Sequence, residues 1–260
     1  MRFDTIPKDL KIKNNWVCAV NGSKLPLQAY IRKAASVSDR TTWSGYEAAK
    51  RAVLNDSYDY LGYVFDGDGI IGIDIDNGYD EDGFLSELSI DCMRACRSYT
   101  EQSRSGRGIH IYVKGRLPFS GANNRQGLEI YSDKRYFIVT GERLIYGEII
   151  ENQEAIDYIV SKYFPTEERA AKEGTRERIY SPVYHPPVGG KISISVEYPK
   201  ILPGMRNISL TSLAGQLHTQ GYSPKQIFIE LLKANSQACD PPLPRDEVKS
   251  IVRSVTRYAR

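Results

Sequence analysis

Two aspartates stand two positions apart in the sequence IIGIDIDNGYD, residues 70–80. Side chains of a β-strand point alternately to its two faces, so Asp74 and Asp76 would lie side by side on one face. Neighbouring carboxylates repel each other unless a cation lies between them, and aspartate is rare inside strands. An exposed sheet face would explain an isolated Asp-x-Asp pair more simply than a metal site does. Further residues must therefore decide between the two.

Two later segments, GIHIYVKG and LEIY, alternate in the same way, with His110 and Glu129 on the side opposite the aliphatic residues. If these segments are neighbours of the aspartate strand in one sheet, the three acids and the histidine gather on one face. Oxygen ligands of this kind suit Mg²⁺ or Mn²⁺, and two such ions about 3.5–4 Å apart are widely used for in-line phosphoryl displacement. The pattern therefore predicts phosphoryl-transfer chemistry at Asp74, Asp76, Glu129 and His110.

The loop SRSGRGIH, which ends at His110, combines two glycines with a hydroxyl at Ser105 and a charge at Arg107. Glycines let the backbone approach a ligand closely, and such a loop can bind phosphate oxygens. A hairpin turn rich in Ser and Gly has the same composition, so both interpretations stay open.

The elements that must position these residues follow from the hydrophobic pattern. Residues 1–164 alternate strand-like and helix-like segments, which predicts a mixed α/β domain. Residues 165–203 are rich in charge, proline and glycine and predict a linker. Residues 204–260 contain three helix-like segments separated by Gly and Pro, which predict a small all-α bundle.

Composition limits the class of protein. Of the 260 residues, 41% are hydrophobic and 26% are charged, as in ordinary soluble globular proteins. No segment has the length and apolarity of a transmembrane helix, and the first residues lack a signal-peptide core, so we expect a cytoplasmic protein with no membrane partner. The four cysteines fit no zinc spacing and are expected to be reduced residues of the core.

Positive charge is concentrated near the C-terminus. Residues 204–260 hold 8 Lys and Arg against 4 Asp and Glu, whereas the rest of the chain is close to neutral. In the last helix-like segment three basic side chains follow one another at four-residue intervals on one face: Lys249, Arg253 and Arg257. They predict either a contact with the phosphates of a nucleic acid or a solvated helix face.

The motifs GIDID, SRSGRGIH and LEIYSDKRYFIVTG resemble, in this order, the three motifs of the archaeo-eukaryotic primase superfamily. The resemblance is to its bifunctional primase-polymerase (prim-pol) branch, which is found in phages, plasmids and other mobile elements. The segment SKLPLQAY, which contains Lys24, resembles the Lys-x-Pro segment of that branch, and residues 204–255 are similar to the primase C-terminal helical domain. The implied fold is a primase-like α/β (α+β) catalytic core with an RNA-recognition-like sheet, followed by a small all-α bundle.

The resemblance also implies roles for individual residues. Two divalent ions, Mg²⁺ or Mn²⁺, would be held by the catalytic acids Asp74, Asp76 and Glu129, of which Glu129 stands where many relatives have Asp. The triphosphate of the incoming nucleotide would be bound by a second set of residues: Ser105, Arg107, His110 and Arg135.

The implied function is template-directed nucleotidyl transfer that synthesises and extends primers on single-stranded DNA. Its partners would be the single-stranded template, the primer-template, NTP or dNTP, and a replicative helicase on a separate chain or in a missing C-terminal region, in a bacterial or phage-infected cell. The alternative is a replication-initiation or origin-binding module that binds nucleotide and DNA without catalysis; an end-joining repair polymerase is more distant. The sequence leaves open the preference for ribo- or deoxynucleotides, the start sequence on the template, the replicon, whether the chain is a fragment, and the oligomeric state. Tyr112 and Tyr131 are candidates for a wall beside the sugar C2′, although ordinary core or surface packing explains each of them more simply.

Overall fold

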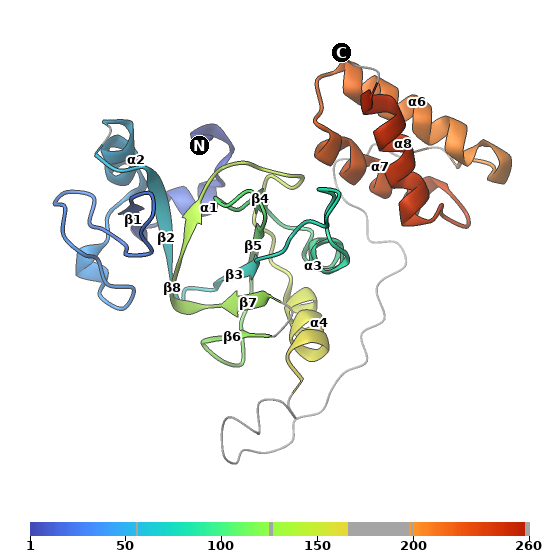
Figure 1. Ribbon diagram of the computed structural model, residues 1–260. Helices are drawn as coiled ribbons and strands as arrows, with labels where there is room; N and C mark the ends of the chain where they lie inside the picture. The colour runs from blue at the N-terminus through green and yellow to red at the C-terminus, as the bar shows by residue number, and fades with distance from the viewer. Residues whose placement is uncertain (56, 125–126, 166–197, 199, 258–260) are drawn as a thin grey trace. The chain divides into compact units, whose positions relative to one another are not determined.

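The computed structural model divides into two compact units, residues 1–79 with 86–184 and residues 80–85 with 185–260. The first unit is mixed α and β and the second is helical (Figure 1), which confirms the fold class expected from the sequence. Each unit is described by itself. The residues that the structure describes are 1–55, 57–124, 127–165, 198 and 200–257.

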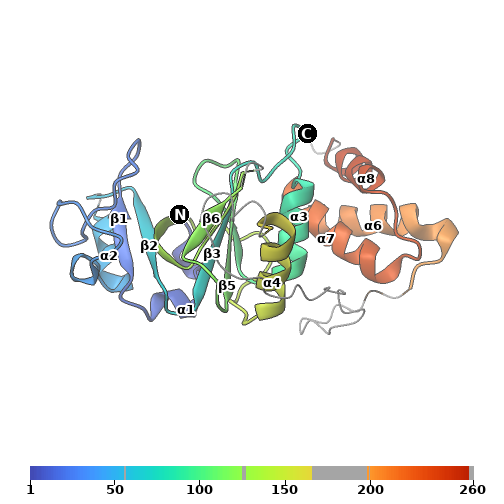
Figure 2. The same cartoon turned by 90° about the horizontal axis from the view of Figure 1, so that it is seen from below.

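A five-stranded antiparallel sheet forms the centre of the first unit. Its strands, in spatial order, are β4 (Thr100–Gln102), β5 (Ile109–Lys114), β3 (Ile70–Ile75), β7 (Leu128–Tyr131) and β6 (Gly121–Asn123). Helices α3 (Glu87–Cys96) and α4 (Gln153–Tyr163) lie on the same side of this sheet (Figure 2). The long aliphatic run of β3 follows from its central place, because a strand covered on both faces is hydrophobic on both.

A second, three-stranded sheet has the order β1 (Trp16–Ala19), β2 (Tyr60–Asp66) and β8 (Asp133–Val139). Helix α2 (Tyr46–Leu54) packs against β1 and β2. The short α1 (Lys8–Lys11) and two 3₁₀ turns, Phe3–Thr5 and Arg40–Thr42, complete the described elements of this unit.

Aromatic side chains from both sheets fill the core between them. Phe65 of β2 stacks on Tyr112 of β5 with ring centres 6.0 Å apart, and it meets Phe137 of β8 edge-to-face at 4.8 Å. Gly72 lies directly below Phe65 and Phe137, where a Cβ atom would overlap both rings. Because this position carries no side chain, β8 can lie close over the centre of the five-stranded sheet.

Most of the expected segments are present, with corrected ends. The strand expected to include Asp76 ends at Ile75, so Asp76 lies in the turn that follows. The short strands β4 and β6 and helix α1 were not expected. All four cysteines are buried and unpaired, which confirms their place in the core.

The second unit contains α6 (Arg206–Thr219), α7 (Pro224–Ala238) and α8 (Arg245–Arg257), preceded by a 3₁₀ turn at Pro203–Met205. The three helices pack on one another, as the sequence predicted (Figure 1). The Asn235 amide donates to the Leu243 carbonyl at 2.9 Å and accepts from the Leu243 N–H at 2.8 Å, which fixes the turn into α8. The domain boundaries stay a prediction, and most of the expected linker, 166–197 and 199, lies outside the described residues.

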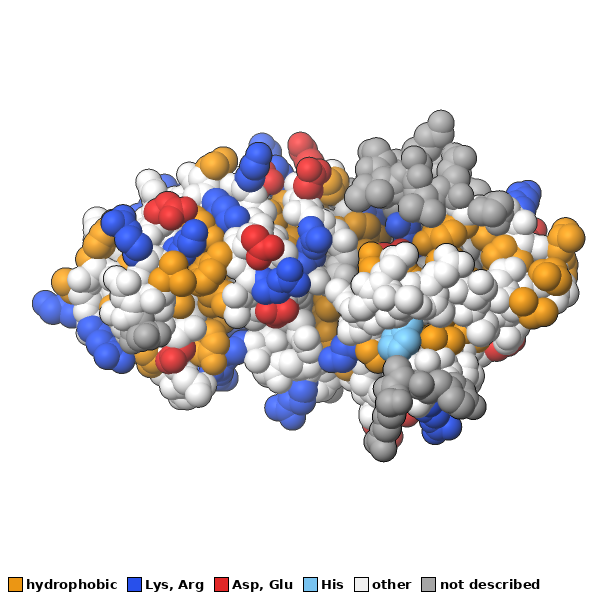
Figure 3. Space-filling view, turned by 90° about the horizontal axis from the view of Figure 1, so that it is seen from above, with side chains coloured by type: hydrophobic (Ala, Val, Ile, Leu, Met, Phe, Trp, Pro, Cys, Tyr) orange, Lys and Arg blue, Asp and Glu red, His pale blue; other side chains and the backbone are white. Residues whose placement is uncertain are grey.

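Basic, acidic and hydrophobic side chains alternate on the face drawn in Figure 3, and no large patch of one charge is seen on it. Among the described residues, no helix is both long and apolar enough to cross a membrane.

Candidate active site

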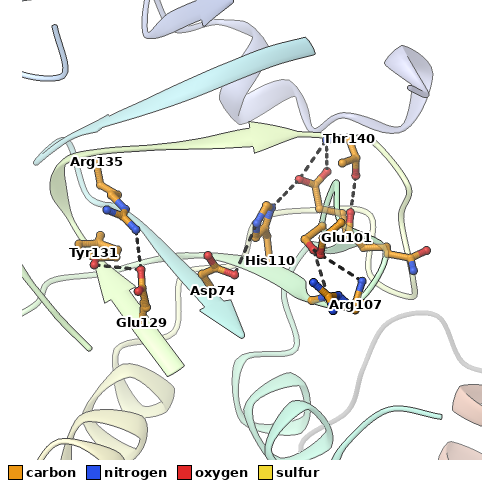
Figure 4. A network of polar contacts seen from close by, with 12 residues as sticks. Asp74, Glu101, Arg107, His110, Glu129, Tyr131, Arg135 and Thr140 are labelled. Atoms are coloured by element: carbon orange, nitrogen blue, oxygen red, sulfur yellow. Dashed lines mark hydrogen bonds and ion pairs between the residues drawn. The ribbon is translucent and has the colours of Figure 1, made fainter. Parts of the chain in front are cut away.

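The register of the five-stranded sheet places Asp74 between His110 and Glu129. On one side Asp74 of β3 is paired with His110 of β5, and on the other it is paired with Glu129 of β7. Directly paired residues of antiparallel strands present their side chains on the same face, so the three side chains form one row (Figure 4). The expectation that these three strands are neighbours is therefore confirmed. Asp76 lies just beyond the strand end and is exposed.

His110 is held in one orientation. Its side chain is 8% exposed and its ring stacks on Phe137 with centres 4.8 Å apart. Nδ1 lies 3.3 Å from Glu101 Oε1 and Nε2 lies 3.7 Å from Asp74 Oδ1. Burial alone would lower the pKa of His110, but the hydrogen bond to Glu101 and the negative charges of Asp74, Glu101 and Asp76 outweigh it and raise that pKa. The imidazole thus turns its Nδ1 proton to Glu101 and its Nε2 atom to Asp74.

Glu101 is a residue of this site that the sequence reasoning missed. It lies in the three-residue strand β4, is fully buried, and accepts hydrogen bonds from side chains and from the backbone after β8. Its donors are the Tyr99 hydroxyl (2.8 Å), the Tyr112 hydroxyl (3.3 Å), the Gly141 N–H (2.8 Å), the Thr140 N–H (3.2 Å) and His110. A buried carboxylate needs such donors, and their number fixes its position. The only available signal was a glutamate in the polar stretch TEQSRSG, directly before the glycine loop.

The same network settles the interpretation of Tyr112 in favour of ordinary core packing. Tyr112 is completely buried and its hydroxyl is committed to Glu101 inside the core. It therefore cannot form a wall beside a bound nucleotide.

Glu129, at the other end of the row, is held at the surface. Its Oε2 atom accepts from Arg135 Nη2 at 2.8 Å and from the Tyr131 hydroxyl at 3.0 Å. The Arg135 guanidinium lies 4.7 Å from the centre of the Tyr131 ring, and its side chain is 46% exposed. β8 (Asp133–Val139) begins directly after β7 (Leu128–Tyr131), so Arg135 lies near the end of β7, and the predicted phosphate-binding Arg135 is paired with the predicted metal ligand Glu129.

The surroundings of Asp74 disfavour its ionised form. Burial raises the pKa of its carboxyl group, and Asp76 and Glu129 raise it further, while His110 and Arg135 act in the opposite direction. A cation at this point would relieve the strain on the ionised form. Within the part of the chain that the structure describes, however, no group of three or more His, Cys, Asp or Glu side chains is gathered so that it could hold a metal ion. Of the three predicted metal ligands, Asp74 and Glu129 are paired in the sheet and Asp76 lies in the turn after β3, and together they do not form a complete set of ligands around one point.

The Ser/Gly loop forms the tight turn between β4 and β5. The Ser103 N–H donates to the Gly108 carbonyl at 2.9 Å, and Gly106 adopts a φ of 72°, which glycine accepts most readily. The Gly78 N–H donates to the Arg107 carbonyl at 2.8 Å, which attaches the loop to the turn after Asp76. Ser105 and Arg107 are both exposed on it. The hairpin turn expected as one interpretation is present, and phosphate binding by these two residues stays a prediction.

Two comparisons show what this chain is similar to. Residues 196–259 match the family described as Primase C terminal 1 (PriCT-1). The chain is also 31% identical over 127 residues to a protein named DNA Primase-polymerase from Nitratiruptor phage NrS-1. The prim-pol resemblance is confirmed. The match covers 46% of this chain and 18% of the phage protein, so it spans less than a fifth of that relative's length.

The basic residues of α8 lie in the part of the chain that matches the primase C-terminal family. Two of them, Lys249 and Arg253, form ion pairs with aspartates. Lys249 Nζ lies 2.6 Å from Asp80 Oδ2, and its side chain is only 9% exposed. Arg253 pairs with Asp82, also inside the second unit. The expectation of one solvent-facing basic side is therefore wrong for Lys249, since helix periodicity does not reveal which acidic segment packs beside it. Arg257 is exposed, and a DNA contact by this set stays a prediction.

Proposed function

We propose that this chain is a template-directed nucleotidyltransferase, a DNA primase and polymerase that synthesises and extends primers on single-stranded DNA. The observation that carries the proposal is the row in which Asp74 is paired on one side with His110 and on the other with Glu129. The phage relative named as a primase-polymerase and the match to the primase C-terminal family support it. The setting would be replication of a phage, plasmid or other mobile element, with a helicase as partner.

Two divalent ions, Mg²⁺ or Mn²⁺, would be held by Asp74, Asp76 and Glu129. The donors are all carboxylate oxygens, which suits these hard cations, and a cation would stabilise the ionised form of Asp74, whose pKa is raised mainly by burial and further by Asp76 and Glu129. When bound, such ions neutralise charge on the phosphates and align the attacking hydroxyl with the phosphorus atom.

Arg135 would change partners during this process. It now pairs with Glu129, but the triphosphate of a nucleotide offers its guanidinium a second anion that binds in the same forked geometry. Moving Arg135 to the triphosphate would free the Glu129 carboxylate for a cation. The Arg135 side chain is 46% exposed and that of Glu129 is 20% exposed, so solvent screens the pair on the Arg135 side and lowers the cost of exchanging partners. Nucleotide binding and completion of the acidic site would therefore be coupled.

His110 would act as a hydrogen-bond donor to the triphosphate, held in a fixed orientation. Its Nδ1–H is held by Glu101, and a proton on Nε2, favoured by the raised pKa, points toward the row that the triphosphate must approach. Ser105 and Arg107 on the neighbouring loop would bind further phosphate oxygens. These residues position and neutralise the nucleotide, which is the main protein contribution to such reactions.

A nucleotide- and DNA-binding module without catalysis is the second candidate. The observation that favours it is the closed pair of Glu129 and Arg135 together with the lack, among the described residues, of an assembled three-ligand cation site. In such a module the pair would stay closed when nucleotide binds.

Incorporation of labelled nucleotides on a primed and an unprimed template, with Mg²⁺ or Mn²⁺, tests the proposal. We expect the wild-type chain to incorporate nucleotide and Asp74→Asn to be inactive. Asp157→Asn, which changes an exposed aspartate of α4, is the matched control and should behave like wild type. Nucleotide binding without any incorporation would reject the enzyme and favour the binding module.

A further inference from the structure

The segment 21–38, between β1 and the turn at Arg40–Thr42, has a composition unlike its surroundings. It carries three cations, Lys24, Arg32 and Lys33, and no Asp or Glu. The face drawn in Figure 3 mixes charges of both signs, so an eighteen-residue stretch of one sign needs a separate explanation. None of the roles assigned to the candidate active site accounts for it.

Backbone hydrogen bonds hold this segment in one conformation. Leu27 and Cys18 of β1 exchange two bonds of 2.8 Å, and the Ala35 N–H donates to the Pro26 carbonyl at 2.8 Å. The Gln28 N–H donates to the Lys33 carbonyl at 3.0 Å, which closes a tight turn. The Tyr58 hydroxyl donates to the Gln28 carbonyl at 2.6 Å and ties the base of that turn to the core.

The residues at the tip of this turn point into solvent. Tyr30 is 76% exposed and Ile31 is 49% exposed. Arg32 and Lys33 beside them are exposed as well, and the Arg32 guanidinium lies 5.9 Å from the centre of the Tyr58 ring. An aromatic ring costs free energy when it is held in water, and a rigid turn that displays one next to two cations is suited to stack a nucleobase and bind its phosphates.

The segment is joined to the candidate active site at two points. Arg104 Nη1, in the Ser/Gly loop, donates to Asn21 Oδ1 at 3.0 Å. The hydroxyl of Tyr136, the neighbour of Arg135 on β8, donates to the Lys24 carbonyl at 2.9 Å. The exposed tip therefore belongs to a loop that begins beside the residues proposed to bind the nucleotide.

We infer that the tip at residues 30–33, here called the 30–33 tip, binds single-stranded nucleic acid. A base stacks on the Tyr30 ring, and the adjacent phosphates contact Arg32 and Lys33. Duplex DNA does not fit this mode, because its bases are already stacked on one another. That the strand is the template rests on the proposed function, whereas strand binding by the tip does not.

Equilibrium binding of a fluorescein-labelled thymidine oligonucleotide, measured by anisotropy without nucleotide or divalent ions, tests the inference. We expect Tyr30→Ala to weaken binding by roughly fivefold or more, as for the loss of one stacked base, and Tyr30→Phe to bind like wild type. The double variant Arg32→Ala/Lys33→Ala should also lower the slope of log affinity against log salt by about 0.7 for each lost phosphate contact.

Two controls make the outcome decisive. Lys8→Ala/Arg51→Ala removes the same charge from exposed positions of the same unit and should leave affinity within about twofold of wild type at matched salt. The same measurement on a duplex of equal length should show no dependence on Tyr30. Unchanged single-strand binding in Tyr30→Ala, a loss of equal size in the control, or no binding by the wild-type chain would each overturn the inference. If wild type binds and Tyr30→Ala does not, but no nucleotide is incorporated, the 30–33 tip is confirmed while the proposed enzyme is rejected.

Discussion

The two ends of the row through Asp74 are held in opposite ways. At one end, His110 is buried and its partner Glu101 accepts hydrogen bonds from five donors on three parts of the chain. At the other end, Glu129 is held by Arg135 and Tyr131, and the Arg135 side chain is 46% exposed. One end is rigid and the other can exchange partners.

The difference indicates which groups must keep one geometry and which must change it. A buried network is costly to rearrange, because every group that loses its partner is left without water. An ion pair that solvent reaches on one side, as at Arg135, is worth about 1 kcal/mol, so a competing anion can open it. We therefore expect substitutions at the His110 end to affect folding and nucleotide binding together, and those at the Glu129 end to affect ligands alone.

The largest effect is expected for Asp74, which lies at the centre of the row between His110 and Glu129. Asp74→Asn should reduce nucleotide incorporation on the order of a thousandfold, because it removes a carboxylate proposed to hold the divalent ions that neutralise the reacting phosphates. It should also raise the melting temperature at pH 7 without divalent ions, since burial and the neighbouring carboxylates disfavour ionised Asp74 and raise its pKa above 3.8. As pH falls through the folded-state pKa, wild type gains this stability and the difference should disappear near pH 3.8.

Melting curves of both proteins across this pH range, with incorporation assays at neutral pH, check the prediction. Near-normal incorporation by a folded Asp74→Asn would remove Asp74 from the chemistry. A lower melting temperature at pH 7 would instead show that the ionised carboxylate supports the fold.

Glu101→Gln perturbs the rigid end. One oxygen becomes an NH₂ group that faces donors such as the Gly141 N–H, so the free energy of unfolding should fall by about 1–3 kcal/mol. His110 also loses its fixed orientation, and the KM for nucleotide should rise about tenfold while the affinity for primer-template is unchanged. Glu142→Gln, at an exposed neighbouring position, should change neither quantity. A folded Glu101→Gln with a normal nucleotide KM would show that Glu101 supports the core without positioning His110.

The rigid end also shows where sequence reasoning stops. Alternation of side chains was enough to place Asp74, His110 and Glu129 each on the polar side of its own strand, because strand periodicity is a local property. That the three strands are neighbours was a condition of the prediction, and the pairing of the strands meets it. Glu101 could not be found in this way: β4 is three residues long, has no apolar alternation, and depends on backbone groups about forty positions away.

Lys249 shows that the same limit of sequence reasoning applies to a helix. The four-residue spacing correctly placed it on one face with its basic neighbours, and the helix itself was predicted. Its partner Asp80 is far away in the sequence, and no local pattern predicts that the two residues form an ion pair. Local periodicity therefore tells which residues share a face, whereas the partners of that face are decided by tertiary packing.

At the exchangeable end, Arg135→Ala should have opposite effects on two ligands. The KM for nucleotide should rise about tenfold with the loss of a bidentate phosphate contact, and Arg135→Lys should fall between, because an ammonium lacks the forked geometry. Mn²⁺ binding without nucleotide should become tighter, since Glu129 is no longer paired. The change in unfolding free energy should stay below about 1 kcal/mol.

Calorimetric titration with Mn²⁺ and nucleotide kinetics measure these two effects, with the exposed Arg116→Ala as the control. Weaker or unchanged Mn²⁺ binding by Arg135→Ala would contradict the exchange of partners, whatever happens to the nucleotide.

The smallest effect is expected for Tyr131→Phe. Burial and the Glu129 carboxylate raise the pKa of Tyr131 to about 12, so its hydroxyl remains a donor to Glu129 at any working pH. Removing it costs one partly exposed hydrogen bond, whose net value of about 0.5–1.5 kcal/mol is an upper limit here. The phenyl ring under Arg135 remains, so incorporation should fall threefold or less and the ratio of NTP to dNTP use should not change. Tyr131→Ala removes the ring as well: if that variant alone alters the sugar ratio in single-nucleotide kinetics, the ring lies beside C2′, and if neither variant does, Tyr131 serves only to hold Glu129 and Arg135.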